Sequence, residues 1–133
     1  ATWLNMNGFR LWGNNTAAYP GITDPKDRWF SVRRFMTWAA NSFILTYFQK
    51  VDSPANKRLI EAIVDSENVR GNGFVARGVC ARYEITFNED ENTTTDLLNG
   101  EITFHQYITP FTPAEDIEDI IEFDPNALSA ALN

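Results

Sequence analysis

The sequence of 133 residues contains one cysteine and one histidine, and it lacks any long hydrophobic run. A lone cysteine, Cys80, excludes an intrachain disulfide framework and a paired-cysteine metal site. No stretch approaches the roughly 18 apolar residues of a membrane-spanning helix, so we predict no membrane partner. Basic residues are absent after Arg82, and the net charge is −7. Such an acidic chain is a poor candidate for binding nucleic acid, and we predict none.

The charge is divided between the two halves of the chain. Residues 1–83 carry all 11 Lys and Arg and six of the 18 Asp and Glu, a net charge of +5. Residues 84–133 carry the other 12 acids and no base. Each half is short for an independent domain, so we interpret residues 1–133 as one domain with polarised charge. This asymmetry favours contacts with partners, and a solvated acidic surface is the alternative.

Hydrophobic periodicity predicts two helices. The first covers residues 31–50 and has few polar positions, which indicates a helix that is central in the core or covered by another chain. The second covers residues 53–68, with Ser53 as its cap and a proline in its first turn. Gly71 and Gly73 weaken the following turn, after which a short helical stretch resumes.

Alternating apolar residues predict four strands, at residues 8–13, 79–87, 101–109 and 117–123. A strand, two helices and three strands predict an α+β fold, in which a small mixed or antiparallel sheet packs against two main α-helices. The remaining residues, 124–133, are rich in small side chains, and we expect them to form an extended terminal arm outside the core.

No pattern of catalytic or ligand-binding residues is complete. Cys80 and His105 could face the same side of the sheet, but no third orienting group accompanies them. The acidic run at residues 88–92 has oxygen ligands at alternate positions, yet Thr93 and Asn99 occupy positions where a calcium loop needs Gly and Glu. We therefore predict that the chain is not an enzyme and holds no cofactor or metal.

One block of the sequence resembles a family signature, and it comprises Gly8, Phe9, Arg10, Leu11, Trp12, Gly13 and Asn14. The block is similar to the GF-R-(F/L)-WGN-x-T pattern near the start of the C-terminal domain of phage contractile-tail sheath proteins, of the kind found in phage P2. Later features follow in a similar order, with Phe30–Arg34 leading into a helix and Thr109–Glu115 following a strand. The resemblance covers about residues 6–125.

The resemblance implies a structural subunit of a sheath around an inner tube, in a phage tail or a related prophage-derived contractile particle. Its partners would be other copies of itself, in six-fold rings stacked helically, and the tail tube protein. Assembly would take place in the bacterial host cytoplasm, and contraction would rearrange the subunits without a cofactor. We also expect the chain to be a fragment of a longer sheath protein, because the large N-terminal and outer domains of the family have no counterpart here.

Two sets of residues are candidate contacts. We hypothesise that residues 120–132 include a C-terminal arm that pairs with the sheet of a neighbouring subunit. Its apolar contacts would come from Ile120, Ile121, Phe123, Leu128 and Leu132. Arg33 and Arg34 are candidates for pairing with acidic groups of the tube or an adjacent subunit, and pairing within their own domain is the alternative.

A second function class is a stand-alone carbohydrate- or protein-binding module. Aromatic side chains anchor many interfaces, and the candidates are Trp3, Trp12, Trp29 and Trp38. Burial in the core is the other fate of such side chains.

Overall fold

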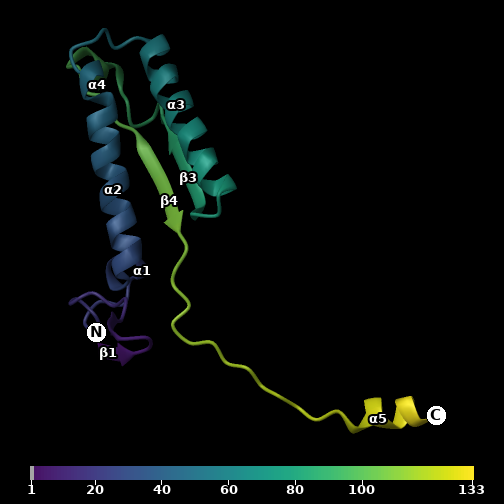
Figure 1. Cartoon of the computed structure of the whole chain (residues 1–133). Helices are drawn as coiled ribbons and strands as arrows, with labels where there is room; N and C mark the ends of the chain where they lie inside the picture. The colour runs from purple at the N-terminus through teal and green to yellow at the C-terminus, as the bar shows by residue number, and fades with distance from the viewer. Residues whose placement is uncertain (1) are drawn as a thin grey trace.

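The computed structural model describes residues 2–133 (Figure 1). In chain order its elements are β1 (Thr2–Asn5), β2 (Phe9–Trp12), α1 (Pro25–Arg28), α2 (Phe30–Tyr47), the 3-10 turn η1 (Phe48–Lys50), α3 (Lys57–Ala76), β3 (Cys80–Thr86), α4 (Thr94–Leu98), β4 (His105–Pro110) and α5 (Pro125–Leu132). This arrangement confirms the predicted α+β class. No helix within the described residues is both long and apolar enough to cross a bilayer.

The body of the molecule is a hairpin of β3 and β4 packed with the two long helices α2 and α3 (Figure 1). The strands are antiparallel, with Tyr83 opposite Ile108. Tyr83 and Ile85 are buried, and the intervening Glu84 is exposed, as the period of two requires. The core cluster combines residues of α2, α3, β3 and β4, namely Ala39, Cys80 and Tyr83 with Phe35, Phe74 and Ile108.

The predicted alternation fails at the start of β3. A register shift lies between Cys80 and Arg82, which places Cys80 in the core and leaves Val79 and Ala81 exposed. An extra residue in one strand of a pair reverses the direction of the side chains that precede it. The single cysteine is therefore a small buried residue of the core.

Helix α3 is continuous from Lys57 to Ala76, so the predicted interruption at Gly71 and Gly73 is wrong. Gly71 is buried against β3, and a Cβ at this position would lie 2.4 Å from the carbonyl oxygen of Tyr83. The glycine is present because the helix and the strand approach each other closely, and packing outweighs its low helix propensity. The predicted cap at Ser53 is also wrong, because the Asn56 side chain accepts from the Leu59 N–H at 2.9 Å.

Near the N-terminal end of α2, the hairpin of β1 and β2 is exposed along its whole length. Asp24 caps α1, and Pro25 is its first residue, a position that suits proline because its missing N–H has no intrahelical partner there. Helices α1 and α2 meet at Trp29, which is buried. This junction, which we call the elbow, fixes the N-terminal hairpin near the start of α2.

The predicted strand at residues 117–123 is wrong. Residues 111–124 form no regular structure, and they leave the body as a long extended segment that ends in α5 (Figure 1). A strand requires a neighbour for its main-chain groups, and this segment has none within residues 2–133. The predicted strand at 101–109 shortens to β4, because the Asn92 side chain bonds to both the N–H and the C=O of Thr103.

Candidate assembly site

The C-terminal arm, residues 111–133, is the most exposed apolar part of the chain. Residues 115–124 include six acids and no base. The apolar side chains among them are 72–88% exposed, and they are Ile117, Ile120, Ile121 and Phe123. Soluble proteins rarely leave a contiguous group of large apolar side chains in water unless another surface covers it. The arm therefore has the composition of a segment that binds elsewhere.

Helix α5 at the end of the arm also lacks cover. Leu128 and Leu132 are four residues apart, so they lie on one face of the helix, and both are exposed. The side chain of Asp124 caps the helix by accepting from the Asn126 N–H at 3.0 Å. A helix of eight residues is marginal in water without tertiary packing. Its apolar face is a second surface that requires a partner.

The two edges of the β3–β4 hairpin differ. On β3, the Asn68 amide donates to the Ile85 carbonyl at 3.2 Å and accepts from the Ile85 N–H at 2.9 Å. Because Ile85 points its main-chain groups away from β4, Gln106 opposite it, and Ile108 two residues on, point theirs away from β3. No hydrogen bond reaches those groups of β4 within residues 2–133. The outer edge of β4 is the open one.

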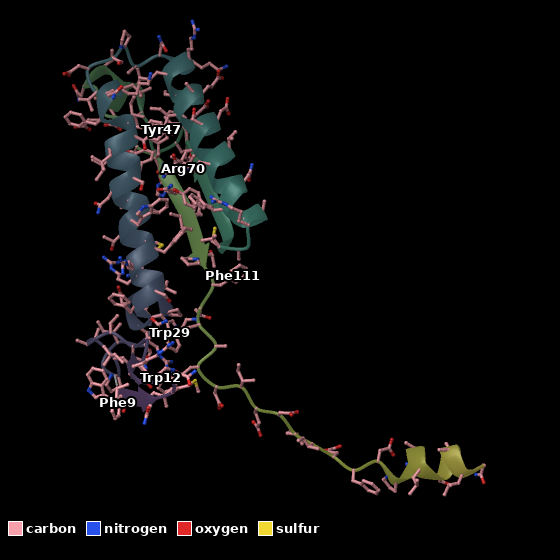
Figure 2. The ribbon with its side chains drawn as sticks, in the orientation of Figure 1. Phe9, Trp12, Trp29, Tyr47, Arg70 and Phe111 are labelled. Carbon is pink, nitrogen blue, oxygen red and sulfur yellow. The ribbon has the colours of Figure 1, made fainter. Side chains whose placement is uncertain are left out.

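The arm is attached to the body at its root. Glu115 accepts from Arg28 Nη2 at 3.1 Å through one oxygen and from Asn15 Nδ2 at 3.2 Å through the other. Arg28 Nε in turn donates to Asn15 Oδ1 at 3.1 Å, so the three side chains form a closed network. Pro113 and Glu115 line one shallow depression together with Trp12 and Trp29, and Figure 2 shows both tryptophans beside the chain that descends from Phe111.

The family block holds the N-terminal hairpin to the elbow. Gly8 and Gly13 have φ values of +105° and +136°, which side chains other than glycine rarely adopt. Between them lies β2, whose Phe9, Arg10, Leu11 and Trp12 are exposed. Asn14 accepts from the Ser31 N–H at 2.9 Å through its side chain and from the Phe30 N–H at 2.7 Å through its carbonyl. The block therefore ends on the first turn of α2.

Arg33 and Arg34 are exposed in the second turn of α2. Arg33 Nη1 lies 3.7 Å from Asp27 Oδ1. A hydrogen bond from Lys26 chiefly, with the charges of Lys26 and Arg33, lowers the pKa of Asp27 against the opposing effect of desolvation. Arg34 has no salt-bridge partner within residues 2–133. Both arginines line a shallow depression that also contains Phe30, Thr37, Trp38 and Asn41.

Much of α2 remains uncovered, as its low polarity suggested. Only Val32 and Ala39 are fully buried in this helix. Its large exposed apolar side chains are Phe30, Trp38, Ile44 and Leu45. The exposed face of α2 thus combines apolar and basic groups, and it is a second candidate contact surface.

A buried polar network joins the body. Glu67 is 1% exposed and accepts from Tyr83 Oη at 2.8 Å, Tyr47 Oη at 3.0 Å and Gln106 Nε2 at 3.3 Å. It also forms an ion pair with Arg70, whose Nη2 lies 2.9 Å from Glu67 Oε1. Burial, and then the hydrogen bond to Glu67, raises the pKa of Tyr47 to about 12. Tyr47 and Arg70 lie between α2 and α3 in Figure 2. The network links α2, α3, β3 and β4, and sequence periodicity gave no signal for it.

The conceivable Cys80–His105 pair does not form. Cys80 pairs with Pro110 and His105 with Thr86, which places them at opposite ends of the hairpin. Burial raises the pKa of the Cys80 thiol, which disfavours a reactive thiolate. Within residues 2–133, no group of three or more His, Cys, Asp and Glu side chains has an arrangement that could hold a metal ion.

No family model matches the chain. Its fold is shared with a chain in the cryo-EM structure of the anti-feeding prophage baseplate, with a TM-score of 0.75 and 18% identity, over 88% of this chain and 34% of that one. At this identity the likeness concerns the fold alone, and it defines an α+β domain of the type found in that particle.

Two curated relatives define the resemblance further. The chain is 32% identical over 111 residues to the tail sheath protein of Burkholderia phage BcepMu, covering 82% of this chain and 23% of that protein. It is 27% identical over 116 residues to the tail sheath protein of Escherichia phage P2, covering 87% of this chain and 28% of that protein. The chain is thus a domain of the phage tail sheath type and spans about a quarter of these relatives, which confirms the resemblance predicted from sequence. They give no support to the stand-alone binding module.

Proposed function

We propose that this chain is the C-terminal domain of a contractile-tail sheath subunit, part of a longer protein, and that its arm joins neighbouring copies. The observation that supports this is the arm itself. It carries large apolar side chains and has no partner beyond Glu115 within residues 2–133. The function is structural and needs no catalytic group, and the arm extends over residues 111–133 rather than 124–133.

The open edge of β4 is the proposed receiving surface. An extended segment can add a strand to such an edge through main-chain hydrogen bonds, and its side chains then set the register. Residues 117–123 of one copy would pair with the free groups of Gln106 and Ile108 of another. Leu128 and Leu132 of α5 would then pack on the same receiving copy. The two copies contribute different surfaces, and contacts of this kind build rings and helical arrays.

The exposed face of α2 is the proposed contact with the tail tube protein or an adjacent subunit. Arg33 and Arg34 lie there beside exposed Phe30 and Trp38. Exposed ion pairs contribute only about 0–1 kcal/mol each, but a lattice of stacked six-fold rings repeats them. The particle would be a phage tail or a prophage-derived contractile device, assembled in the cytoplasm of the bacterial host.

Two variants test the proposal, and each retains only one of the two proposed contact surfaces, the arm or the open edge of β4. Deletion of residues 116–133 removes the arm and leaves β4 intact. Ile108→Pro keeps the arm and removes an N–H from the open edge. Because each variant lacks one of the two surfaces, neither should self-associate, whereas an equimolar mixture should form a 1:1 complex in analytical ultracentrifugation. The wild-type chain should form larger species.

Controls separate pairing from misfolding. Circular dichroism with thermal melting checks that Ile108→Pro retains the fold, and the double substitution Tyr107→Glu and Thr109→Glu is a second way to weaken the edge, through repulsion of the acidic arm. A mixture that stays monomeric, or a wild-type chain that stays monomeric at millimolar concentration, would contradict the proposal. Reversing the charges of Arg33 and Arg34 should reduce co-assembly of the whole sheath protein with its tube, as counted by electron microscopy.

A further inference from the structure

We infer that Arg28 and Asn15 are positioning residues for the arm: they hold its root at Glu115 and thereby set where the free part of the arm begins. The inference rests on the proposed function, because it concerns how far the arm of one copy reaches toward another. It is carried by the closed network that joins three segments of the chain, of which Glu115 lies 100 residues from Asn15 and 87 from Arg28.

The geometry of the network is specific to these side chains. Both carboxylate oxygens of Glu115 are occupied, each by a donor from a different part of the body. The guanidinium of Arg28 lies 4.3 Å from the ring centroid of Tyr19 and 4.3 Å from that of Trp29. A planar guanidinium between two rings has little freedom left to lose, so it is preorganised for the carboxylate.

The residue that follows the family block, Asn15, supplies the other donor. Asn14 is bonded to the first turn of α2, and the next residue, Asn15, pairs with Trp29 in an isolated β-bridge. Thr16 donates its N–H to the Arg28 carbonyl at 2.8 Å. The segment after Gly13 therefore fixes Asn15 and Arg28 relative to each other before the arm engages them. The conformation of the block and the direction of the arm are coupled through these contacts.

The contacts that hold Glu115 to Arg28 and Asn15 can also break. The side chains of Arg28 and Glu115 are 26% and 46% exposed, so water and salt compete with the pair. When Glu115 is held, the arm is free from Asp116 onward. When it is released, the arm is free from Phe111, which adds five residues and up to about 17 Å of reach. The network thus gives the arm a short, directed state and a longer one that keeps copies joined while they move apart.

Distance distributions between two spin labels test this inference in the whole chain. The labels are placed at Ser66→Cys on α3 and Ile117→Cys just beyond the network, and native Cys80 is 1% exposed and does not compete for label. Labelled chains are diluted to the monomeric range. We expect a single narrow distribution, which Glu115→Gln and Arg28→Lys should broaden about twofold, because residues 111–115 become a flexible connection.

The matched control is Glu118→Gln, which removes the same charge from a position in the arm with no contact to the body. It should leave the distribution narrow. Equal widths in the wild type and in Glu115→Gln would overturn the inference, and so would a broad wild-type distribution. Because the labels report on one monomer, this result is independent of the mixing experiment above. Failure of the mixture to associate would remove the proposed function and leave the positioning of the arm intact.

Discussion

The body and the arm of this chain differ in whether their polar and apolar groups have partners within the chain. In the body, a buried carboxylate, Glu67, has four partners from four elements, and the two long helices cover the inner face of the hairpin. In the arm, large apolar side chains are exposed, and the main chain of residues 116–123 makes no hydrogen bond within residues 2–133. The body therefore carries its own stability, whereas the arm carries contacts that only another molecule can complete.

Among the substitutions considered in the body, we expect replacement of Glu67 to reduce its stability most. We expect Glu67→Ala to lower the free energy of unfolding by about 3–5 kcal/mol, because it leaves Arg70 without its ion-pair partner and two tyrosine hydroxyls without their shared acceptor. Urea denaturation followed by tryptophan fluorescence measures this loss. The control is Glu61→Ala, on the same helix, where the exposed pair with Lys57 should be worth less than about 0.5 kcal/mol.

Gly71 and Gly73 provide a matched pair on α3. Gly71→Ala should destabilise the chain by about 1–3 kcal/mol, because its Cβ would lie 2.4 Å from the Tyr83 carbonyl oxygen and 2.5 Å from Cδ1 of the same residue. Gly73→Ala meets nothing within 4 Å and should stabilise the helix by up to about 1 kcal/mol. Opposite signs in urea denaturation support the packing described here, and equal effects would contradict it.

The tyrosines of the Glu67 network make the body sensitive to alkali. The folded pKa of Tyr47 is about 12, above its ordinary value of 10.0, so the proton is held more tightly in the folded state. The stability from this group is complete below pH 10 and is lost as the pH rises toward 12. Burial also raises the pKa of Tyr83. The melting temperature should fall between pH 9 and pH 11.5, and the fall should be shallower in Tyr47→Phe than in the wild type. Equal falls in the two proteins would contradict the role given to Tyr47.

The smallest effect on stability is expected in the arm. Ile120→Ser with Ile121→Ser should change the free energy of unfolding by less than about 0.5 kcal/mol, because both side chains are already in water. The same double variant should abolish self-association in analytical ultracentrifugation. Ile63→Ala is the contrasting change, since this isoleucine is buried in α3 and its truncation should cost about 2–5 kcal/mol. If the double variant Ile120→Ser with Ile121→Ser is stable and still self-associates, the role given to these two isoleucines is refuted.

The sequence predicted the parts of the fold that depend on local periodicity. Helix α2 follows from the spacing of its apolar residues. The errors arose where tertiary contact decided the outcome: Gly71 serves a close approach to Tyr83, and a bulge turns Cys80 inward. For residues 117–123, alternating apolar residues indicated a strand, but no partner strand lies beside this segment within residues 2–133.

The candidate site was only partly accessible to sequence reasoning. The arm residues and the family block could be named in advance because they are local features. The network at the root could not, because Arg28 and Glu115 lie 87 residues apart and each is an ordinary charged residue by itself. The available signal was the pair Asn14 and Asn15 at the end of the block and just after it, since Asn and Thr often bond to nearby main chain and fix loops.

The Asn68 amide has a consequence for the shape of any assembly. By occupying both main-chain groups of Ile85, it closes one side of the hairpin to further strands. In the proposed arrangement each copy then forms two strand-pairing contacts. Its arm pairs with one neighbour, and the open edge of its β4 receives the arm of another. Strand pairing of this kind, by itself, builds unbranched chains or closed rings, so the stacking of rings into a lattice depends on other surfaces such as the exposed face of α2. A single amide on a helix thereby limits the topology of the polymer.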